Sequence, residues 1–184
     1  MAAPQRRWAA EILYIWFHKL RPQDWFGPEP WVDEMLRDRF QPELEVLAGR
    51  TATEFMTDPR TALASVVLFD QVPRNIYRGT SRAFATDELA RAIARGALDR
   101  GWDAGLSFAQ RQFLAMPLMH SEDILDQERS LSQFGRLPRR YGWPFAVSHH
   151  RMIARFGRFP HRNAVLDRPS TPAEERAVAA GFAW

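Results

Sequence analysis

The segment of residues 58–71 constrains the fold more than any other part of the chain. Asp58 followed by Pro59 is typical of a helix start, because the aspartate side chain caps the first turn and proline fits the first helical position. Residues 60–71 then form a helical pattern that is apolar on most sides. A helix without a polar face must be covered by other elements. We therefore expect this helix to be the central buried one.

Apolar residues recur at helical spacing in the other segments too, between the prolines and glycines that separate them. Helices are predicted over residues 7–19, 32–41, 43–48, 86–101, 107–116, 121–134, 145–156 and 171–180. A kink is expected at Pro42, and Pro73 is expected to end the central helix and begin an irregular connection over 72–80. No segment alternates apolar and polar residues as a strand would. The chain is therefore predicted to be all-α, with no sheet, as a bundle or as stacked antiparallel hairpins.

Length and composition predict one domain, residues 1–184, because 184 residues with 46% apolar content can bury a core of their own. The absence of cysteine excludes disulfides and thiolate sites, and is compatible with a reducing compartment. The apolar run at 12–17 is too short for a signal peptide or a membrane span. We expect a cytoplasmic protein that does not enter a membrane.

The charge of the chain is unevenly distributed, although the net charge is only +3. Between Glu128 and Asp167 there is no acidic residue, whereas arginine occurs at positions 129, 136, 139, 140, 151, 155, 158 and 162. Such a distribution favours anions on part of the surface. The alternative is that these arginines pair with carboxylates from other segments, and both interpretations remain open.

Residues 148–163 hold three of the five histidines and four arginines. The planar guanidinium group suits phosphate or carboxylate, and a histidine could act as general acid or base. This stretch therefore predicts one wall of a pocket for an anionic small molecule, with His150, His161, Arg155, Arg158 and Arg162 as candidates. A solvated basic face is the alternative. If the helix continues past Gly157, residues 151, 155 and 158 form a guanidinium stripe.

A second group of candidates follows the central helix. Asp70 and Arg74 are four residues apart, and Asn75 and Arg78 come directly after them. One carboxylate and several donors could surround a polar ligand. A structural ion pair that stabilises an irregular loop would give the same pattern.

A third group consists of His120, Glu122 and Asp123, which with His150 or His161 could bind a divalent metal. The alternative is a helix start with Ser121 as the cap and two acids in the first turn, which leaves only His120 unexplained. Because no two histidines stand four residues apart, we predict neither a metal site nor a cofactor.

Three blocks together resemble the bacterial domain of unknown function 924 family: residues 68–80 (LFDQVPRNIYRGT), residues 117–123 (PLMHSED), and His150 followed by residues 155–163 (RFGRFPHRN). Trp16-Phe17 and residues 168–174 also fit, so the resemblance covers most of the chain. It implies antiparallel helical hairpins stacked in a tetratricopeptide-like superhelical array, and it implies no activity. The chain departs from the family pattern at Asp167, where glycine is usual.

The three groups predict a polar pocket lined by arginine, histidine and acidic residues that binds an anionic small molecule and could be catalytic. Its candidate catalytic residues are His120, His150 and His161, and its candidate ligand-binding residues are Asp70, Arg74, Asn75, Glu122, Asp123, Arg155, Arg158, Arg162 and Asn163. The alternative is a tetratricopeptide-like module that binds a peptide or partner protein in a groove. Nucleic acid is disfavoured, because no recognisable binding module occurs.

Overall fold

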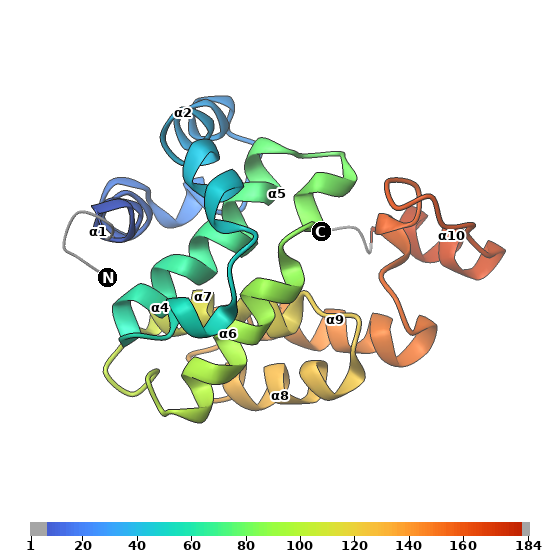
Figure 1. Ribbon diagram of the computed structural model, residues 1–184. Coiled ribbons are helices and arrows are strands. Elements are labelled where there is room, and N and C mark those ends of the chain that lie inside the picture. Colours follow the sequence, from blue (N-terminus) through green and yellow to red (C-terminus); the bar gives the residue numbers. More distant parts are fainter. Residues whose placement is uncertain (1–6, 182–184) are drawn as a thin grey trace.

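The computed structural model describes residues 7–181, and in this part of the chain the regular secondary structure is all helical, without a strand (Figure 1). The α-helices are α1 (Arg7–Tyr14), α2 (Pro30–Leu47), α3 (Ala52–Phe55), α4 (Pro59–Val66), α5 (Val72–Ile76), α6 (Asp87–Asp99), α7 (Phe108–Met119), α8 (Ile124–Phe134), α9 (Trp143–Phe156) and α10 (Pro172–Ala179). Shorter helical segments are η2 (Ile15–Lys19), η3 (Pro22–Asp24), η4 (Val67–Gln71), η5 (Ser81–Phe84) and η6 (Pro160–Arg162). The all-α prediction is confirmed.

The predicted central helix is α4 together with the π-helical segment η4. Asp58 caps it, with Oδ1 accepting hydrogen bonds from the backbone amides of Arg60 at 3.0 Å and Thr61 at 2.9 Å. Every residue from 61 to 73 is buried. α4 packs against α1, α6 and α7, and this explains why it needs no polar face.

The prediction that Pro73 ends the central helix is wrong. The helix continues through η4 into α5 and ends at Ile76. In the π-helical turn the amide of Val72 bonds to the carbonyl of Val67, five residues back. Proline has no N–H for the carbonyl of Phe69, and the hydroxyl of Thr86 donates to that carbonyl instead, at 2.6 Å. A side chain from another segment thus satisfies the group that the proline leaves unpaired.

Other predicted boundaries also shift. α2 runs unbroken across Pro42, which lies on the exposed side of the helix. Proline has no N–H to donate to the preceding turn, but on this side water can hydrogen-bond to the carbonyl that is left without a donor. The cap of α8 is Asp123 rather than Ser121, because Asp123 Oδ1 accepts from the amide of Leu125 at 2.9 Å. α9 begins at Trp143, two residues before the predicted start. The short helix α3 was not predicted.

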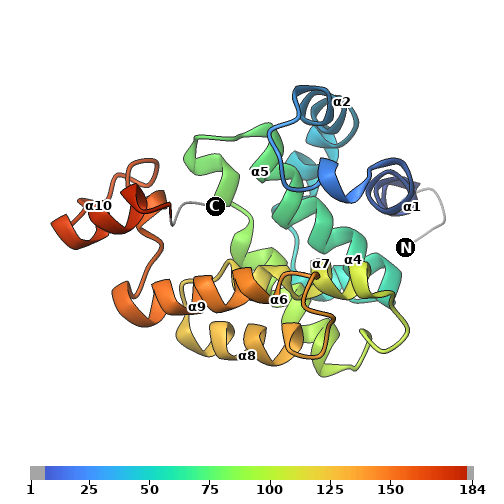
Figure 2. The same ribbon diagram turned by 180° about the vertical axis from the view of Figure 1, so that it is seen from behind.

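Helices α6 to α9 pack in chain order, each against the next, and α8 and α9 lie side by side in both views (Figures 1 and 2). After α9 the chain turns through η6 to α10, at the edge of the molecule. The C-terminal part forms a small apolar cluster of its own, around Met152, Ile153, Phe159 and Ala177. In this arrangement Arg162 of η6 lies against Phe84 of η5 and close to Asp87, the first residue of α6. No helix within residues 7–181 is long and apolar enough to cross a bilayer.

Candidate functional site

Asp70 lies at the centre of a buried polar network. Its Oδ1 is 2.8 Å from His120 Nδ1 and 3.2 Å from Arg74 Nη1, and its Oδ2 accepts a hydrogen bond from Gln71 Nε2 at 2.6 Å. Burial alone would raise the pKa of Asp70, but Arg74 and His120 hold that pKa well below its usual range. Asp70 is therefore a buried anion at neutral pH.

Arg74 links Asp70 to Asp87, the first residue of α6. Its two terminal nitrogens donate to the two Asp87 carboxylate oxygens at 2.8 and 2.9 Å. Arg74 also donates to the backbone carbonyl of Asp70 at 2.7 Å. This bidentate pair joins the central helix to α6 and occupies both Asp87 oxygens.

His120 follows α7 and is oriented by Asp70. Burial lowers the pKa of His120 below its ordinary value, although Asp70 acts in the opposite direction, so the imidazole is neutral at pH 7. A neutral ring beside a carboxylate carries its proton on Nδ1, and Nε2 is then the basic nitrogen. A buried carboxylate fixes the tautomer of a catalytic histidine in the same way in the serine protease triad.

Arg162 in η6 approaches this network from the C-terminal part of the chain. The residue is only 6% exposed, and its guanidinium lies 4.6 Å from the ring centroid of Phe84 and 4.5 Å from that of Phe159. Within the described residues its one side-chain hydrogen bond is a long one, 3.5 Å from Nη1 to Asp87, and its buried Nε has no partner. Burial and the nearby Arg74 lower the pKa of Arg162 to about 10. It remains a cation with most of its donors unused.

Glu122 connects the same region to the last part of the chain. Its Oε1 accepts from the backbone amide of Phe159 at 2.8 Å and from Arg168 Nη2 at 2.9 Å, and its Oε2 accepts from Arg168 Nη1 at 2.7 Å. Arg168 also donates to Asn163 Oδ1 at 3.1 Å, and Asn163 is 1% exposed. Glu122 therefore binds Phe159 and Arg168 and is not an acid in the first turn of α8, the alternative role that the sequence suggested.

A cavity of about 300 Å³ lies beside these groups. Its lining comes from η5, α6, the α7–α8 connection and η6, and includes Phe84, Asp87, His120, Ser121, Glu122 and Arg162. Three of the residues singled out in the sequence thus line one cavity: His120 and Glu122 from the α7–α8 connection, and Arg162 from η6. Asp70 and Arg74 lie behind it.

Two further histidines lie close to the cavity. The ring centroid of His149 is 6.2 Å from that of His120 and 5.3 Å from that of Phe159, and the His161 ring is 5.7 Å from Phe159. Burial lowers the pKa of His149 to about 3 and that of His161 to about 4, with neighbouring positive groups acting in the same direction. Both rings are therefore neutral in the folded protein at pH 7.

These histidines predict a loss of stability at mildly acidic pH. The unfolded chain takes up the proton near pH 6.5, whereas folded His149 resists protonation until about pH 3, so stability falls as the pH drops through this window. For His149 alone we expect a loss of about 2 kcal/mol between about pH 6.5 and 5. Urea unfolding at a series of pH values measures it. His149→Phe should flatten the profile, and replacing the exposed His18 with Gln should not. Equal profiles for His149→Phe and the parent would contradict the assignment.

The other predicted residues lie away from the cavity. Arg155 is exposed and stacks on Phe156, and Arg158 pairs with Glu174 of α10 at 2.6 Å. Asp123 caps α8 and lies 3.5 Å from Arg95. Asn75 donates to the carbonyl of Gln71. The half-buried His150 lies on α9 and does not line the cavity.

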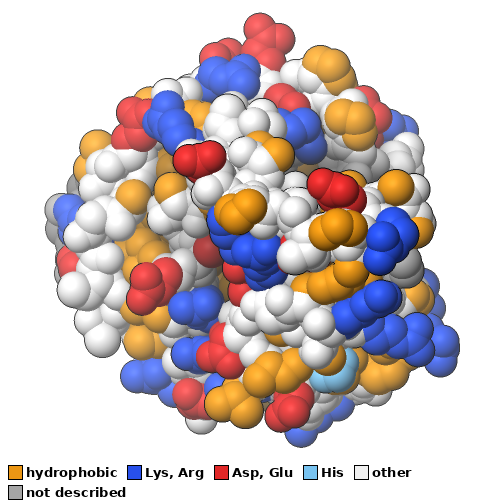
Figure 3. All heavy atoms as spheres, turned by 90° about the vertical axis from the view of Figure 1, so that its right-hand side faces the viewer, with side chains coloured by type: hydrophobic (Ala, Val, Ile, Leu, Met, Phe, Trp, Pro, Cys, Tyr) orange, Lys and Arg blue, Asp and Glu red, His pale blue; other side chains and the backbone are white. Residues whose placement is uncertain are grey.

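The predicted guanidinium stripe does not form. α9 ends at Phe156, and Gly157 adopts φ 69°, a left-handed conformation that ends the helix before residue 158. The arginine-rich region is partly paired, because Arg129, Arg158 and Arg162 have acidic partners. In Figure 3, acidic and basic side chains lie next to each other over much of the visible face, and further basic ones gather toward its right-hand edge.

Asp167 has a structural explanation. Its φ is 52°, and it is the one residue other than glycine with positive φ among residues 7–181. This left-handed conformation is the one that glycine adopts without strain, and aspartate tolerates it better than most residues. The side chain of Arg168 donates hydrogen bonds to Glu122 and Asn163. The carboxylate that pairs with Arg168 is therefore Glu122 and not its neighbour Asp167.

Sequence reasoning missed Asp87, Phe84 and the partnership of Arg168 with Glu122. Asp87 lies at the start of α6, where a helix-start role accounts for it locally and gives no indication of its pair with Arg74. Within the part of the chain that the structure describes, no group of three or more histidine, aspartate or glutamate side chains is placed to hold a metal ion.

The fold and the site define an all-helical protein in which a buried carboxylate, histidine and arginine network borders a polar cavity. The family model of a bacterial protein of unknown function (DUF924) matches residues 12–181, and the chain belongs to this family. The solved structure of the protein of unknown function ATU0120 from Agrobacterium tumefaciens is similar, with 38% identity and a TM-score of 0.88, over 94% of this chain and 97% of that one. No curated protein matches.

Proposed function

We propose that the polar cavity binds the phosphate or carboxylate group of a small molecule, with Arg162 as the principal ligand. The observation that carries this proposal is the state of Arg162: it is buried, charged and bonded through one long contact. A buried charge without a full set of partners is costly, and an anion in the cavity would supply them.

The nearby acids do not remove the need for an anion. Both oxygens of Asp87 are held by Arg74, and both oxygens of Glu122 by Arg168. Asp70 is surrounded by Arg74, His120 and Gln71. Arg162 thus shares its one acidic partner, Asp87, with Arg74, and its contact to that carboxylate is the longer one.

His120 is the group in position to exchange a proton with the bound molecule. It lines the cavity, Asp70 holds its Nδ1, and no group of the described residues bonds to its Nε2. A neutral imidazole with a free Nε2 can act as a general base and, once protonated, as a general acid. His120 is therefore the proposed catalytic residue of this site.

Thermal shift and calorimetric titration with inorganic phosphate test the proposal, with sodium chloride matching the ionic strength. At ten times Kd, phosphate should raise Tm by about 3–6 °C. Arg162→Gln should abolish this shift, and Arg155→Gln, an exposed arginine of the same stretch, should retain it. Succinate then replaces phosphate to distinguish the two anion classes. An equal response of the Arg162→Gln protein and the parent to both anions would refute the proposal.

The second candidate is a tetratricopeptide-like array of stacked hairpins that binds a peptide or partner protein in a groove. The packing of α6, α7, α8 and α9 in chain order supports it, because stacked arrays bury their faces against neighbours in sequence. A stoichiometric partner retained on the immobilised protein, and retained equally by Arg162→Gln, would favour this candidate over the pocket.

A further inference from the structure

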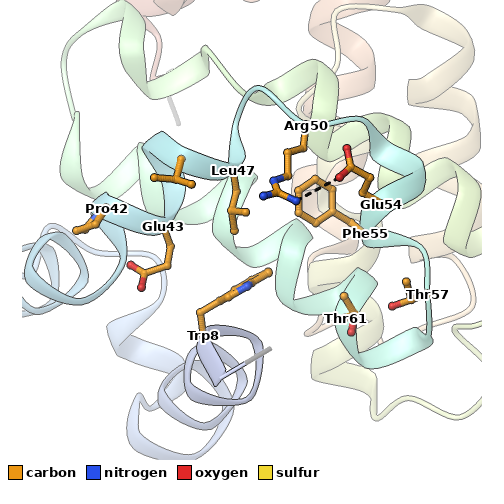
Figure 4. Close-up of a pocket in the computed structure, with 10 residues that line it drawn as sticks. Trp8, Pro42, Glu43, Leu47, Arg50, Glu54, Phe55, Thr57 and Thr61 are labelled. Carbon is orange, nitrogen blue, oxygen red and sulfur yellow. Dashed lines mark hydrogen bonds and ion pairs between the residues drawn. The ribbon is translucent and has the colours of Figure 1, made fainter. Parts of the chain in front are cut away.

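A second cavity, of about 320 Å³, lies between α1, α2, α3 and the start of α4 (Figure 4). Its residues come from the first third of the chain, and none of them lines the polar cavity. Most of its walls are apolar: Trp8 of α1, Val46 and Leu47 of α2, and Phe55 of α3. Val46 is 71% exposed, so the cavity is bordered by apolar surface that the fold leaves open.

One charged group in this cavity has no counterpart. The Oε2 atom of Glu43 is buried and has no hydrogen-bond partner, and no ion pair of the described residues includes Glu43. The other charged residues of the lining, Arg50 and Glu54, pair with each other at 3.3 Å, as the dashed line in Figure 4 shows. The charge left without a partner in the cavity is therefore negative.

The aromatic ring of Trp8 adds a second feature suited to a cation. In Figure 4 the Trp8 side chain rises from α1 toward α2 and α3, and Glu43 extends from α2 on the neighbouring wall. An indole face attracts an ammonium group through its quadrupole, and the buried Oε2 atom of Glu43, which has no hydrogen-bond partner, can accept a hydrogen bond from that group. The apolar walls would cover the body of the same molecule.

We propose that this cavity is a binding site for a small organic ammonium ion with an apolar body, held by Glu43 and Trp8. The size of the cavity suits a small molecule rather than a folded partner. The site is independent of the proposed anion site, since the two share no residue.

Benzylamine and benzyl alcohol form a matched pair of probes, because they differ in the ammonium group alone. In an NMR titration of the labelled protein, the chain has seven indole N–H signals, and Trp8→Phe assigns the one from Trp8. We expect benzylamine to shift the Trp8 signal with a Kd of about 1 mM, and benzyl alcohol to bind about tenfold more weakly.

Glu43→Gln keeps the shape of the side chain and removes its charge. It should weaken benzylamine binding about tenfold and leave benzyl alcohol nearly unchanged, whereas Glu34→Gln, an exposed residue of the same helix, should change neither. Equal binding of the two probes to the parent protein would overturn the proposal even if the Glu43 variant failed to fold. A Trp8 signal that stays unshifted up to about 10 mM benzylamine would overturn it as well.

Discussion

Replacing Asp70 with Asn is expected to lower the free energy of unfolding by about 3 kcal/mol or more. Asp70 is fully buried and its two oxygens serve His120, Arg74 and Gln71. Asparagine has a similar volume but offers one acceptor and adds a donor, so one of these partners would face an N–H group. Arg74 would also lose one of its two carboxylates within a buried region.

Urea unfolding followed by circular dichroism measures this effect. Asp99→Asn is the matched control, because Asp99 also pairs with an arginine, Arg129 at 2.6 Å, but is 64% exposed. A surface pair of this kind contributes less than about 1 kcal/mol. Similar losses for the two variants would mean that the buried network does not stabilise the fold more than a surface ion pair.

The second large effect is expected at Glu122. Glu122→Ala removes three hydrogen bonds that tie the α7–α8 connection to Phe159 and Arg168. We expect a loss of about 2–3 kcal/mol in the stability of residues 157–181, because Arg168 and the Phe159 amide are left unpaired in a partly buried region. Glu122→Gln retains an acceptor for Phe159 and should cost less.

Hydrogen exchange distinguishes this local effect from global unfolding. Amides of residues 157–181 should exchange faster in Glu122→Ala, and those of α4 should change little, because the C-terminal apolar cluster is separate from the main core. Glu128→Ala, an exposed residue of α8, serves as the control. Uniform acceleration along the chain would show that the C-terminal part and the core unfold as one unit.

These two residues also explain how the candidate site is held together. Asp70 orients His120 from the central helix, and Glu122 fixes the segment that carries Arg162. The proposed proton-exchanging group and the proposed anion ligand therefore depend on different anchors. A substitution of Asp70 can therefore perturb His120 without moving Arg162, and a substitution of Glu122 can perturb Arg162 without moving His120.

Local sequence signals determined much of the fold. The Asp58 cap and the apolar pattern of the central helix are present as predicted, and the helices predicted from residues 107 and 171 begin with the capping boxes Ser107–Gln110 and Thr171–Glu174. Each of these signals lies within a single helix, so it can be identified without knowledge of the rest of the chain. The spacing of Asp70 and Arg74 indicated a possible pair, but only the continuation of the helix past Pro73, which the sequence did not predict, places both residues on one helix face.

Tertiary structure alone decided which charges pair and whether Pro73 ends a helix. Arg162 lies 75 residues from Asp87, and Arg168 lies 46 from Glu122; nothing near either residue indicates its partner. The helix passes Pro73 because Thr86, from another segment, donates to the carbonyl of Phe69. Ion pairing and backbone satisfaction depend on distances in space, and these are set by how the helices pack rather than by their own patterns.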